Sequence, residues 1–208
     1  MSLQRRPFPS GGGRRSRRGS DAEPPDDGLP PDGSRAAEAD PEQVARQICL
    51  HQLEHAPRTR AELAATLSAR GVPDDVATAV LGRFTEVGLI DDALFAQMWV
   101  TSRHRGRGLA GRALTQELRR KGVDDEVVRE AVDGLDPAQE EATARALVAR
   151  RLPSTRGAAP DARVRRLAGM LARKGYPAGL AFRVVKEALA AESDDVELSF
   201  DELQALEE

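Results

Sequence analysis

The sequence predicts an all-α protein of three tandem three-helix repeats, which form an elongated curved array between disordered N- and C-terminal tails. Two observations support this prediction. Aromatic residues make up only 3% of the 208 residues, whereas alanine, leucine and arginine, which favour helices over sheets, are prominent. A pattern of leucines and glycine also recurs at intervals of 51 and 53 residues, and a period near 50 is typical of arrays of supersecondary units.

Residues 1–39 form the first segment, and we expect them to be disordered. They are poor in hydrophobic residues and rich in glycine, proline, serine and charge. Such a segment cannot bury enough apolar surface to offset the entropy lost on ordering. The character changes at Asp40-Pro41, where the aspartate predicts a helix N-cap and the proline predicts the first helical position.

Three glycines, Gly71, Gly122 and Gly175, anchor the repeated pattern. In each repeat, leucines stand eight and four residues before the glycine, and a basic residue stands directly before it. The leucines are Leu63 and Leu67, Leu114 and Leu118, and Leu167 and Leu171. Leucines four residues apart share one face of a helix. The glycine is typical of the left-handed position that ends a helix, where the preceding cation complements the negative helix end.

Each repeat contains two further helices, one after the glycine and one before the leucine pair. The residues after each glycine favour a new helix start: Pro73-Asp74-Asp75, Asp124-Asp125-Glu126 and Pro177. Thr59-Arg60-Ala61-Glu62 predicts a capping box. The helices before the leucine pairs are expected at 42–55, 91–104 and 137–151. The predicted repeats are therefore 40–90, 91–135 and 136–190, followed by an acidic tail at 191–208 that holds eight acids and no base.

One short motif resembles a metal site. His51-Gln52-Leu53-Glu54-His55 has the H-x-x-E-H pattern, in which two imidazoles at i and i+4 could share a zinc ion on a helix. A catalytic zinc site needs a third protein ligand. The remaining histidine, His104, falls in a different repeat. We therefore expect a polar helix face and no metal.

A second motif resembles a nucleotide site. Residues 106–111 match G-x-G-x-x-G, but the dinucleotide fingerprint requires a preceding strand, and residues 91–105 have the pattern of an amphipathic helix. The glycines are instead expected to form a flexible hinge between two basic helices. Cys49 has no catalytic neighbour in the sequence and is expected to pack in the core. No catalytic constellation is found, so we expect no enzyme and no cofactor.

The cysteine content and the hydropathy indicate a compartment. A single cysteine cannot form an internal disulfide, which favours a reducing environment. No stretch approaches about 20 consecutive apolar residues, and no apolar segment follows the basic N-terminus. We expect a monomeric protein of the cytoplasm that does not contact a membrane.

Basic residues gather in the second and third repeats and are the predicted partner-binding residues. They are Arg103, Arg105, Arg107, Arg112, Arg119, Arg120 and Lys121, with Arg165, Arg166, Arg173 and Lys174 in the third repeat. Such runs are usually solvated helix faces, but two adjacent repeats of the same sign favour a continuous positive face. That face would engage phosphates or the acidic patches of a protein partner.

The pattern resembles a known family. Leu89-Ile90-Asp91-Asp92-Ala93-Leu94-Phe95-Ala96, followed by Arg103, Gly108, Leu114, Leu118 and Lys121-Gly122-Val123, is similar to the central signature of the RecX family. Arg58-Thr59-Arg60-Ala61-Glu62-Leu63 and Leu171-Ala172-Arg173-Lys174-Gly175-Tyr176 also resemble that family's repeats. The resemblance covers about residues 42–190.

The resemblance implies a function. Members of the family regulate homologous recombination, DNA repair and the SOS response by lying in the groove of the RecA filament on single-stranded DNA. They block filament growth or promote disassembly, and thereby inhibit the recombinase. The alternative, which the residues alone leave open, is a stand-alone helical nucleic-acid-binding protein. In either case direct contact with DNA is expected to be weak, electrostatic and dependent on salt.

Overall fold

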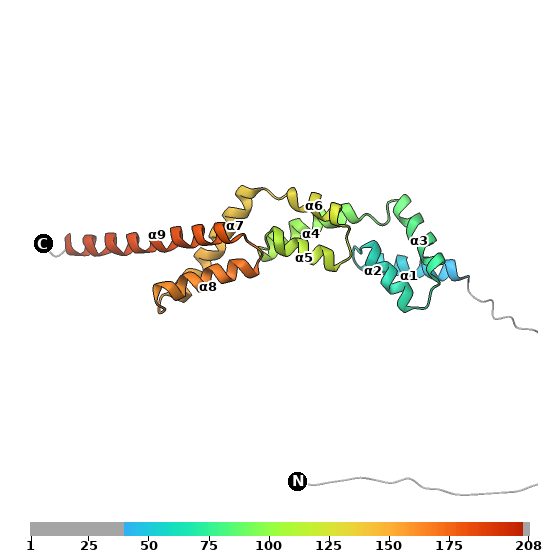
Figure 1. Cartoon of the computed structure of the whole chain (residues 1–208), viewed down its shortest axis with the longest axis horizontal. Coiled ribbons are helices and arrows are strands. Elements are labelled where there is room, and N and C mark those ends of the chain that lie inside the picture. The colour runs from blue at the N-terminus through green and yellow to red at the C-terminus, as the bar shows by residue number, and fades with distance from the viewer. Residues whose placement is uncertain (1–39, 206–208) are drawn as a thin grey trace, which may run out of the picture. The chain divides into compact units, whose positions relative to one another are not determined.

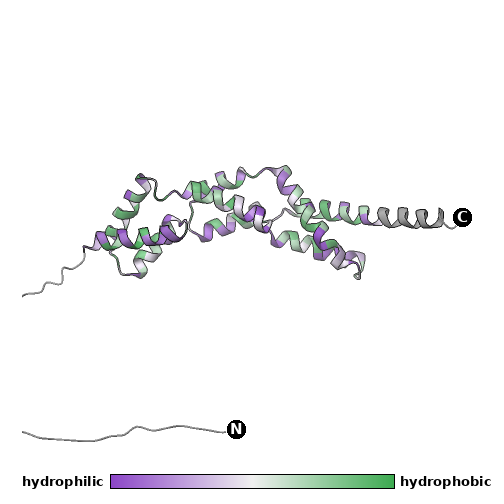
Figure 2. Cartoon of the chain, turned by 180° about the vertical axis from the view of Figure 1, so that it is seen from behind, coloured by the Kyte–Doolittle hydropathy of each residue, from purple (hydrophilic) through white to green (hydrophobic). Residues whose placement is uncertain are grey.

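The computed structural model describes residues 40–205, with side chains to residue 193, and confirms the all-α prediction (Figure 1). Within these residues the secondary structure is helical, with no strand. The predicted N-terminal arm, residues 1–39, lies outside the described residues, as do residues 206–208 of the acidic tail. Figure 2 shows hydrophobic and hydrophilic residues alternating along the helices, as expected of amphipathic helices that each bury one face.

The first three-helix unit consists of α1 (Pro41–His55), α2 (Arg60–Ala69) and α3 (Asp74–Glu86). Asp40 caps α1 through its side chain, and the predicted capping box is present, because Thr59 and Glu62 each accept the other's backbone N–H. Helix α3 packs on both α1 and α2. The three helices enclose a core of their own.

The second unit consists of α4 (Asp92–Arg107), α5 (Gly111–Arg120) and α6 (Asp125–Asp133). Helix α4 extends three residues beyond its predicted end at 104. It ends at Gly108, which adopts a left-handed φ of 60°. The N-cap of α4 is Asp91, whose side chain accepts the N–H of Leu94. Helix α6 packs on α4 and α5 around the second core.

The third unit consists of α7 (Pro137–Arg151), a short 3-10 helix η1 (Leu152–Thr155), α8 (Pro160–Arg173) and α9 (Ala178–Ala205). Helix α9 packs on α7 and α8. The predicted boundary between unit and tail at 190/191 falls inside α9, whose backbone stays helical to Ala205. One physical reason for this continuation is Glu192. Its carboxylate pairs with Arg156 at 2.7 Å and with Arg163, so this part of α9 contacts the rest of the third unit.

The repeated leucine and glycine positions have the predicted roles. All six leucines are at most 1% exposed. The glycines Gly71, Gly122 and Gly175 have φ of 74°, 75° and 94°, and each is the C′ residue of a Schellman motif. In each motif the residue after the glycine donates its N–H to the carbonyl of the second leucine, at 3.1–3.2 Å.

The corner around Gly122 joins the second unit to the first. Thr59 Oγ1, at the N-cap of α2, donates a hydrogen bond to the carbonyl oxygen of Lys121 at 2.7 Å. A Cβ atom on Gly122 would overlap the Cβ of Ala61. Glycine is therefore required here twice, for its positive φ and for the close approach of α2.

The corner around Gly175 joins the third unit to the second in the same way. The backbone N–H of Ala110, the N-cap of α5, donates to the carbonyl oxygen of Lys174 at 2.8 Å. A Cβ on Gly175 would lie 2.8 Å from the Cβ of Ala113 and 3.0 Å from the carbonyl oxygen of Ala110. Gly71, in the first unit, has no neighbouring atom within 4 Å of such a Cβ.

These three glycines form a matched series. Gly71→Ala should lower the free energy of unfolding by about 1–2 kcal/mol, because alanine is strained at positive φ. Gly122→Ala and Gly175→Ala should cost about 1–3 kcal/mol more, because the added methyl group also collides with the preceding unit. Equilibrium urea denaturation followed by circular dichroism measures all three. Equal losses in the three variants would contradict the two joints.

Candidate partner-binding surface

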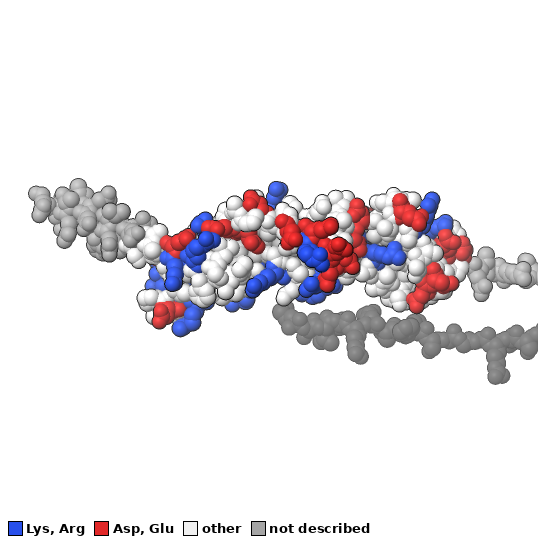
Figure 3. All heavy atoms as spheres, turned by 45° about the horizontal axis from the view of Figure 1, so that its top comes forward, with Lys and Arg blue, Asp and Glu red and all other residues white. Residues whose placement is uncertain are grey.

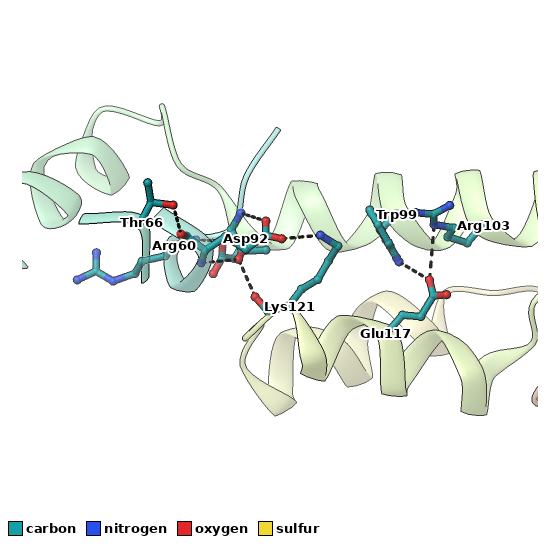
Figure 4. Close-up of polar contacts among 9 residues, drawn as sticks. Arg60, Thr66, Asp92, Trp99, Arg103, Glu117 and Lys121 are labelled. Atoms are coloured by element: carbon teal, nitrogen blue, oxygen red, sulfur yellow. Dashed lines mark hydrogen bonds and ion pairs between the residues drawn. The ribbon is translucent and has the colours of Figure 1, made fainter. Parts of the chain in front are cut away.

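Two of the predicted basic residues belong to a cluster of side chains between α4 and α5 (Figure 4). Trp99 Nε1 donates a hydrogen bond to Glu117 Oε2 at 3.0 Å. Arg103 lies with its Nε 3.5 Å from the same oxygen and its Cζ 4.0 Å from the Trp99 ring centroid. Arg107 Nη1 is 3.6 Å from Glu117 Oε1. Arg103 and Arg107 are therefore held by the single acid of segment 103–121.

Lys121 lies at the joint between the first two units (Figure 4). Its Nζ donates to Glu62 Oε1 at 2.6 Å and lies 4.4 Å from the Trp99 ring centroid. Burial alone would raise the pKa of Glu62. The hydrogen bonds from Lys121 and the Thr59 N–H, with the charges of Lys121 and Arg58, outweigh burial and hold that pKa below its ordinary value of 4.5. The lysine thus couples α5 to α2.

Asp92 adds a second contact across the same joint. Its Oδ1 accepts the backbone N–H of Arg60 at 2.9 Å, so a residue of α4 satisfies an N–H in the first turn of α2 (Figure 4). Such N–H groups have no partner within their own helix. Asp91 caps its own helix, α4, whereas the side chain of Asp92 accepts a hydrogen bond from the neighbouring unit.

Lys174 is the counterpart of Lys121 in the third unit. Its Nζ donates to the carbonyl oxygen of Arg107 at 2.6 Å. Burial, followed by the positive charges of Arg150 and Arg107, lowers the pKa of Lys174. Like Lys121, this lysine makes a hydrogen bond across a joint between units and is only partly exposed.

Three other predicted residues of the third unit meet in one cleft. Arg165, Arg166 and Arg173, all on α8, line a cleft of about 820 Å³ together with Arg151 at the end of α7. The remaining lining residues are Ser154, Thr155, Ala162 and Met170. Within residues 40–193, none of the four arginines forms an ion pair. Among the side chains that the structure describes, the cleft is therefore a concentration of positive charge without an ion-pair partner.

The sequence did not single out Arg151 as a binding residue. Arg163, which contacts the cleft residue Thr155, has a different role. Arg163 pairs with Glu192 and donates from Nε to Thr155 Oγ1 at 3.1 Å, so its charge is compensated. The available indication was the position of Arg151 at the end of the predicted helix 137–151, directly after Arg150.

The rest of the predicted set is dispersed over the second unit. Arg119 pairs with Asp125 at 2.7 Å, and Arg120 donates to the carbonyl of Gln116. Arg105 and Arg112 are exposed and, within the described side chains, have no ion pair. Figure 3 shows acidic and basic side chains intermixed on the displayed face, so a continuous positive face stays a prediction for the remaining surface.

The G-x-G-x-x-G segment forms a packed corner between α4 and α5, rather than the flexible hinge predicted. A Cβ at Gly108 would come 2.9 Å from Leu147 Cδ1, and the Gly111 N–H donates to Glu140 Oε1 at 2.9 Å. Helix α4 precedes it, where the nucleotide fingerprint requires a strand. The tight contacts with α7 are the reason that the corner is fixed.

Two other residues noted in the sequence, His104 and Cys49, are buried in the fold. His104 is 3% exposed, and its Nδ1 and Nε2 lie 2.9 Å from the Leu109 carbonyl oxygen and from Thr143 Oγ1. Cys49 is buried as predicted, and burial raises the pKa of its thiol, which disfavours the reactive thiolate. None of the described helices combines the length and the hydropathy that spanning a bilayer requires.

Comparison with known proteins places these three units in a family. Models of the first, second and third three-helix domains of RecX match residues 45–84, 91–132 and 139–185, one in each unit. "Regulatory protein RecX" of Thermobifida fusca is 62% identical over 168 residues, covering 81% of this chain and 90% of that protein. The protein of the same description from Streptomyces coelicolor is 58% identical over 163 residues, 78% and 87% of the two chains.

The chain belongs to the RecX family. Its fold agrees with solved RecX structures. The crystal structure of RecX from Lactobacillus salivarius superposes with a TM-score of 0.67 at 17% identity, over 72% of this chain and 97% of that one. A second crystal structure of regulatory protein RecX gives a TM-score of 0.65 at 21% identity, over 72% and 73% of the two chains. The recognition made from the sequence signature is thereby confirmed.

The Lys121–Glu62 pair gives this RecX-family chain a testable pH dependence. Because the folded-state pKa of Glu62 is lowered, its carboxylate adds stability above pH 4.5, and this is lost as the pH falls through the lowered value. Glu62→Gln should therefore lower the free energy of unfolding at pH 7 by about 1–2 kcal/mol, with a smaller difference near pH 3.

Chemical denaturation at both pH values measures this difference. The control is Glu86→Gln, which removes the exposed pair with Arg83 and should change stability by less than about 0.5 kcal/mol. A Glu62→Gln loss that is no larger than the control, or that persists at low pH, would contradict the assignment.

Proposed function

We propose that this chain binds the RecA filament on single-stranded DNA and regulates the recombinase, mainly by inhibiting it. The RecX-family relatives are described as regulatory proteins, which supports a regulatory role. The proposal includes a monomeric chain that acts in the cytoplasm and has no catalytic activity of its own. Within the proposed mechanism, the three units bind as one connected body along several neighbouring recombinase protomers.

The observation that carries the proposal is the arginine cleft of the third unit. Arg151, Arg165, Arg166 and Arg173 leave four guanidinium groups without an ion-pair partner among the described side chains. The planar guanidinium group matches carboxylate and phosphate oxygens with two parallel hydrogen bonds. A filament of protein on DNA offers both kinds of anion. We therefore place the main contact at this cleft, with Arg105 and Arg112 of the second unit in support.

The same cleft supports a second candidate, a stand-alone nucleic-acid-binding protein. Four guanidinium groups in one cleft would also attract the phosphates of free DNA. The two candidates differ in what each requires. A filament regulator acts at concentrations that leave bare DNA largely unbound, whereas a DNA-binding protein shows its main affinity without the recombinase.

The proposal predicts the effect of reversing the charge of the cleft. The triple variant Arg165→Glu, Arg166→Glu, Arg173→Glu should require at least about tenfold more protein for half-inhibition, a loss of about 1.4 kcal/mol. The measurement is the DNA-dependent ATPase of the cognate RecA, titrated with each protein. The matched control is Arg70→Glu, Arg83→Glu, Arg129→Glu, which makes the same change in net charge at exposed positions of other units. The control should inhibit as the unaltered protein does.

Both variants are checked for helical content by circular dichroism, and binding to the same single-stranded DNA is measured alone. Equal inhibition by the folded cleft variant and the control would contradict the proposed surface. Tight binding to bare DNA without any inhibition would favour the second candidate. In that case log K should fall linearly with log salt, with a slope of about −0.7 per phosphate contacted.

A further inference from the structure

The last turn of α1 gathers three metal-ligating side chains. His51, Glu54 and His55 each offer one ligand atom, and these atoms lie within 4.8 Å of one another. All three side chains are exposed. The H-x-x-E-H pattern in the sequence supplied two imidazoles and left a third ligand missing. The structure places the Glu54 carboxylate beside both rings, so the donor set is two nitrogens and one oxygen.

A hydrogen bond prepares one of the rings for a metal. His55 Nδ1 lies 2.7 Å from the backbone carbonyl oxygen of His51. A carbonyl oxygen only accepts, so Nδ1 carries the proton and donates it. In the neutral ring this leaves the lone pair on Nε2 free. Metal-binding histidines ordinarily show this arrangement, in which the other ring nitrogen donates to a carbonyl or carboxylate and fixes the tautomer.

The electrostatic surroundings favour a cation overall. The three residues stand at the C-terminal end of α1, where the unpaired carbonyls give the helix a partial negative charge. Among the described ion pairs none uses Glu54. One group opposes a cation, namely Arg70, which lines a cleft of about 350 Å³ together with His51. The site should therefore bind an ion moderately rather than tightly.

The distances require only a small adjustment. Two ligands about 2.0–2.1 Å from a tetrahedral zinc ion are roughly 3.4 Å apart. The three ligand atoms must therefore approach one another by about an ångström, which rotation of exposed side chains allows. The two rings already stand edge to face, with centroids 4.6 Å apart.

We propose that His51, Glu54 and His55 form a binding site for one Zn²⁺ ion, with a water molecule in the fourth position. The donor set of two imidazoles and one carboxylate suits zinc and the neighbouring transition metals, and not Mg²⁺ or Ca²⁺. The ion would link residues one turn apart and hold the end of α1 against fraying. This site is separate from the arginine cleft, and the proposal does not rest on the proposed function.

The test uses the full chain without a histidine tag. Calorimetric titration with Zn²⁺ at pH 7.5 should give one ion per chain, and Zn²⁺ should raise the thermal midpoint. His51→Ala and His55→Ala should each weaken binding at least about tenfold and remove the midpoint shift. Glu54→Gln should weaken binding less, since it retains both imidazoles. The control Glu86→Gln, an exposed acid on α3, should bind as the unaltered chain does.

One further readout identifies the ligands. The spectrum with Co²⁺ in place of Zn²⁺ should lack sulfur-to-metal charge transfer, which excludes Cys49 as a ligand. No saturable binding, or binding that survives in both histidine variants, would overturn the proposal.

Discussion

The structure depends on one repeated contact between a helix end and a helix start. The corner that ends the second helix of one unit docks on the N-cap of the second helix in the unit before it. The carbonyls of Lys121 and Lys174 accept hydrogen bonds from Thr59 Oγ1 and the Ala110 N–H. A helix C-terminus carries unpaired carbonyls and partial negative charge, and an N-terminus carries unpaired N–H groups and partial positive charge. Each joint therefore satisfies a carbonyl at the helix end, with the N-cap hydroxyl as donor in the first joint and the N-cap N–H as donor in the second.

The joints also determine which cations remain for a partner. Lys121 and Lys174 directly precede the glycines and lie in the joints. The ammonium group of Lys121 donates a hydrogen bond to Glu62, and that of Lys174 donates one to the Arg107 carbonyl oxygen. The arginines on α8 point into a cleft without acids and keep their charge uncompensated within the described region. Although the chain is net acidic, packing brings four guanidinium groups together in this cleft, and none of the described acids pairs with them.

The sequence predicted the units well because each unit is defined by local patterns. Leucines at i and i+4, a basic residue and glycine at the helix end, and a capping box at Thr59 are all short-range features, and the structure confirms them. The joints join residues about 60 positions apart, so no local period reveals them. The indications were two small residues, Ala61 and Ala113, which lie in the first turns of α2 and α5 opposite the glycines.

The ion pairs of the predicted binding residues could not be read from the sequence for the same reason. A run of cations gives no sign of which ones will find an acid after folding. Glu117 is the single acid of segment 103–121, and it holds Arg103 and Arg107. Local charge also gave no sign that α9 continues past residue 190, where Glu192 pairs with Arg156 and Arg163.

A double-mutant cycle across the first joint tests the central claim most directly. Glu62→Gln, Lys121→Met and the combined variant are compared by equilibrium denaturation at pH 7. If the pair joins the two units, the losses should be non-additive, with a coupling energy of about 1 kcal/mol or more. Additive losses within about 0.3 kcal/mol would show that the two side chains act independently and would contradict the joint as described.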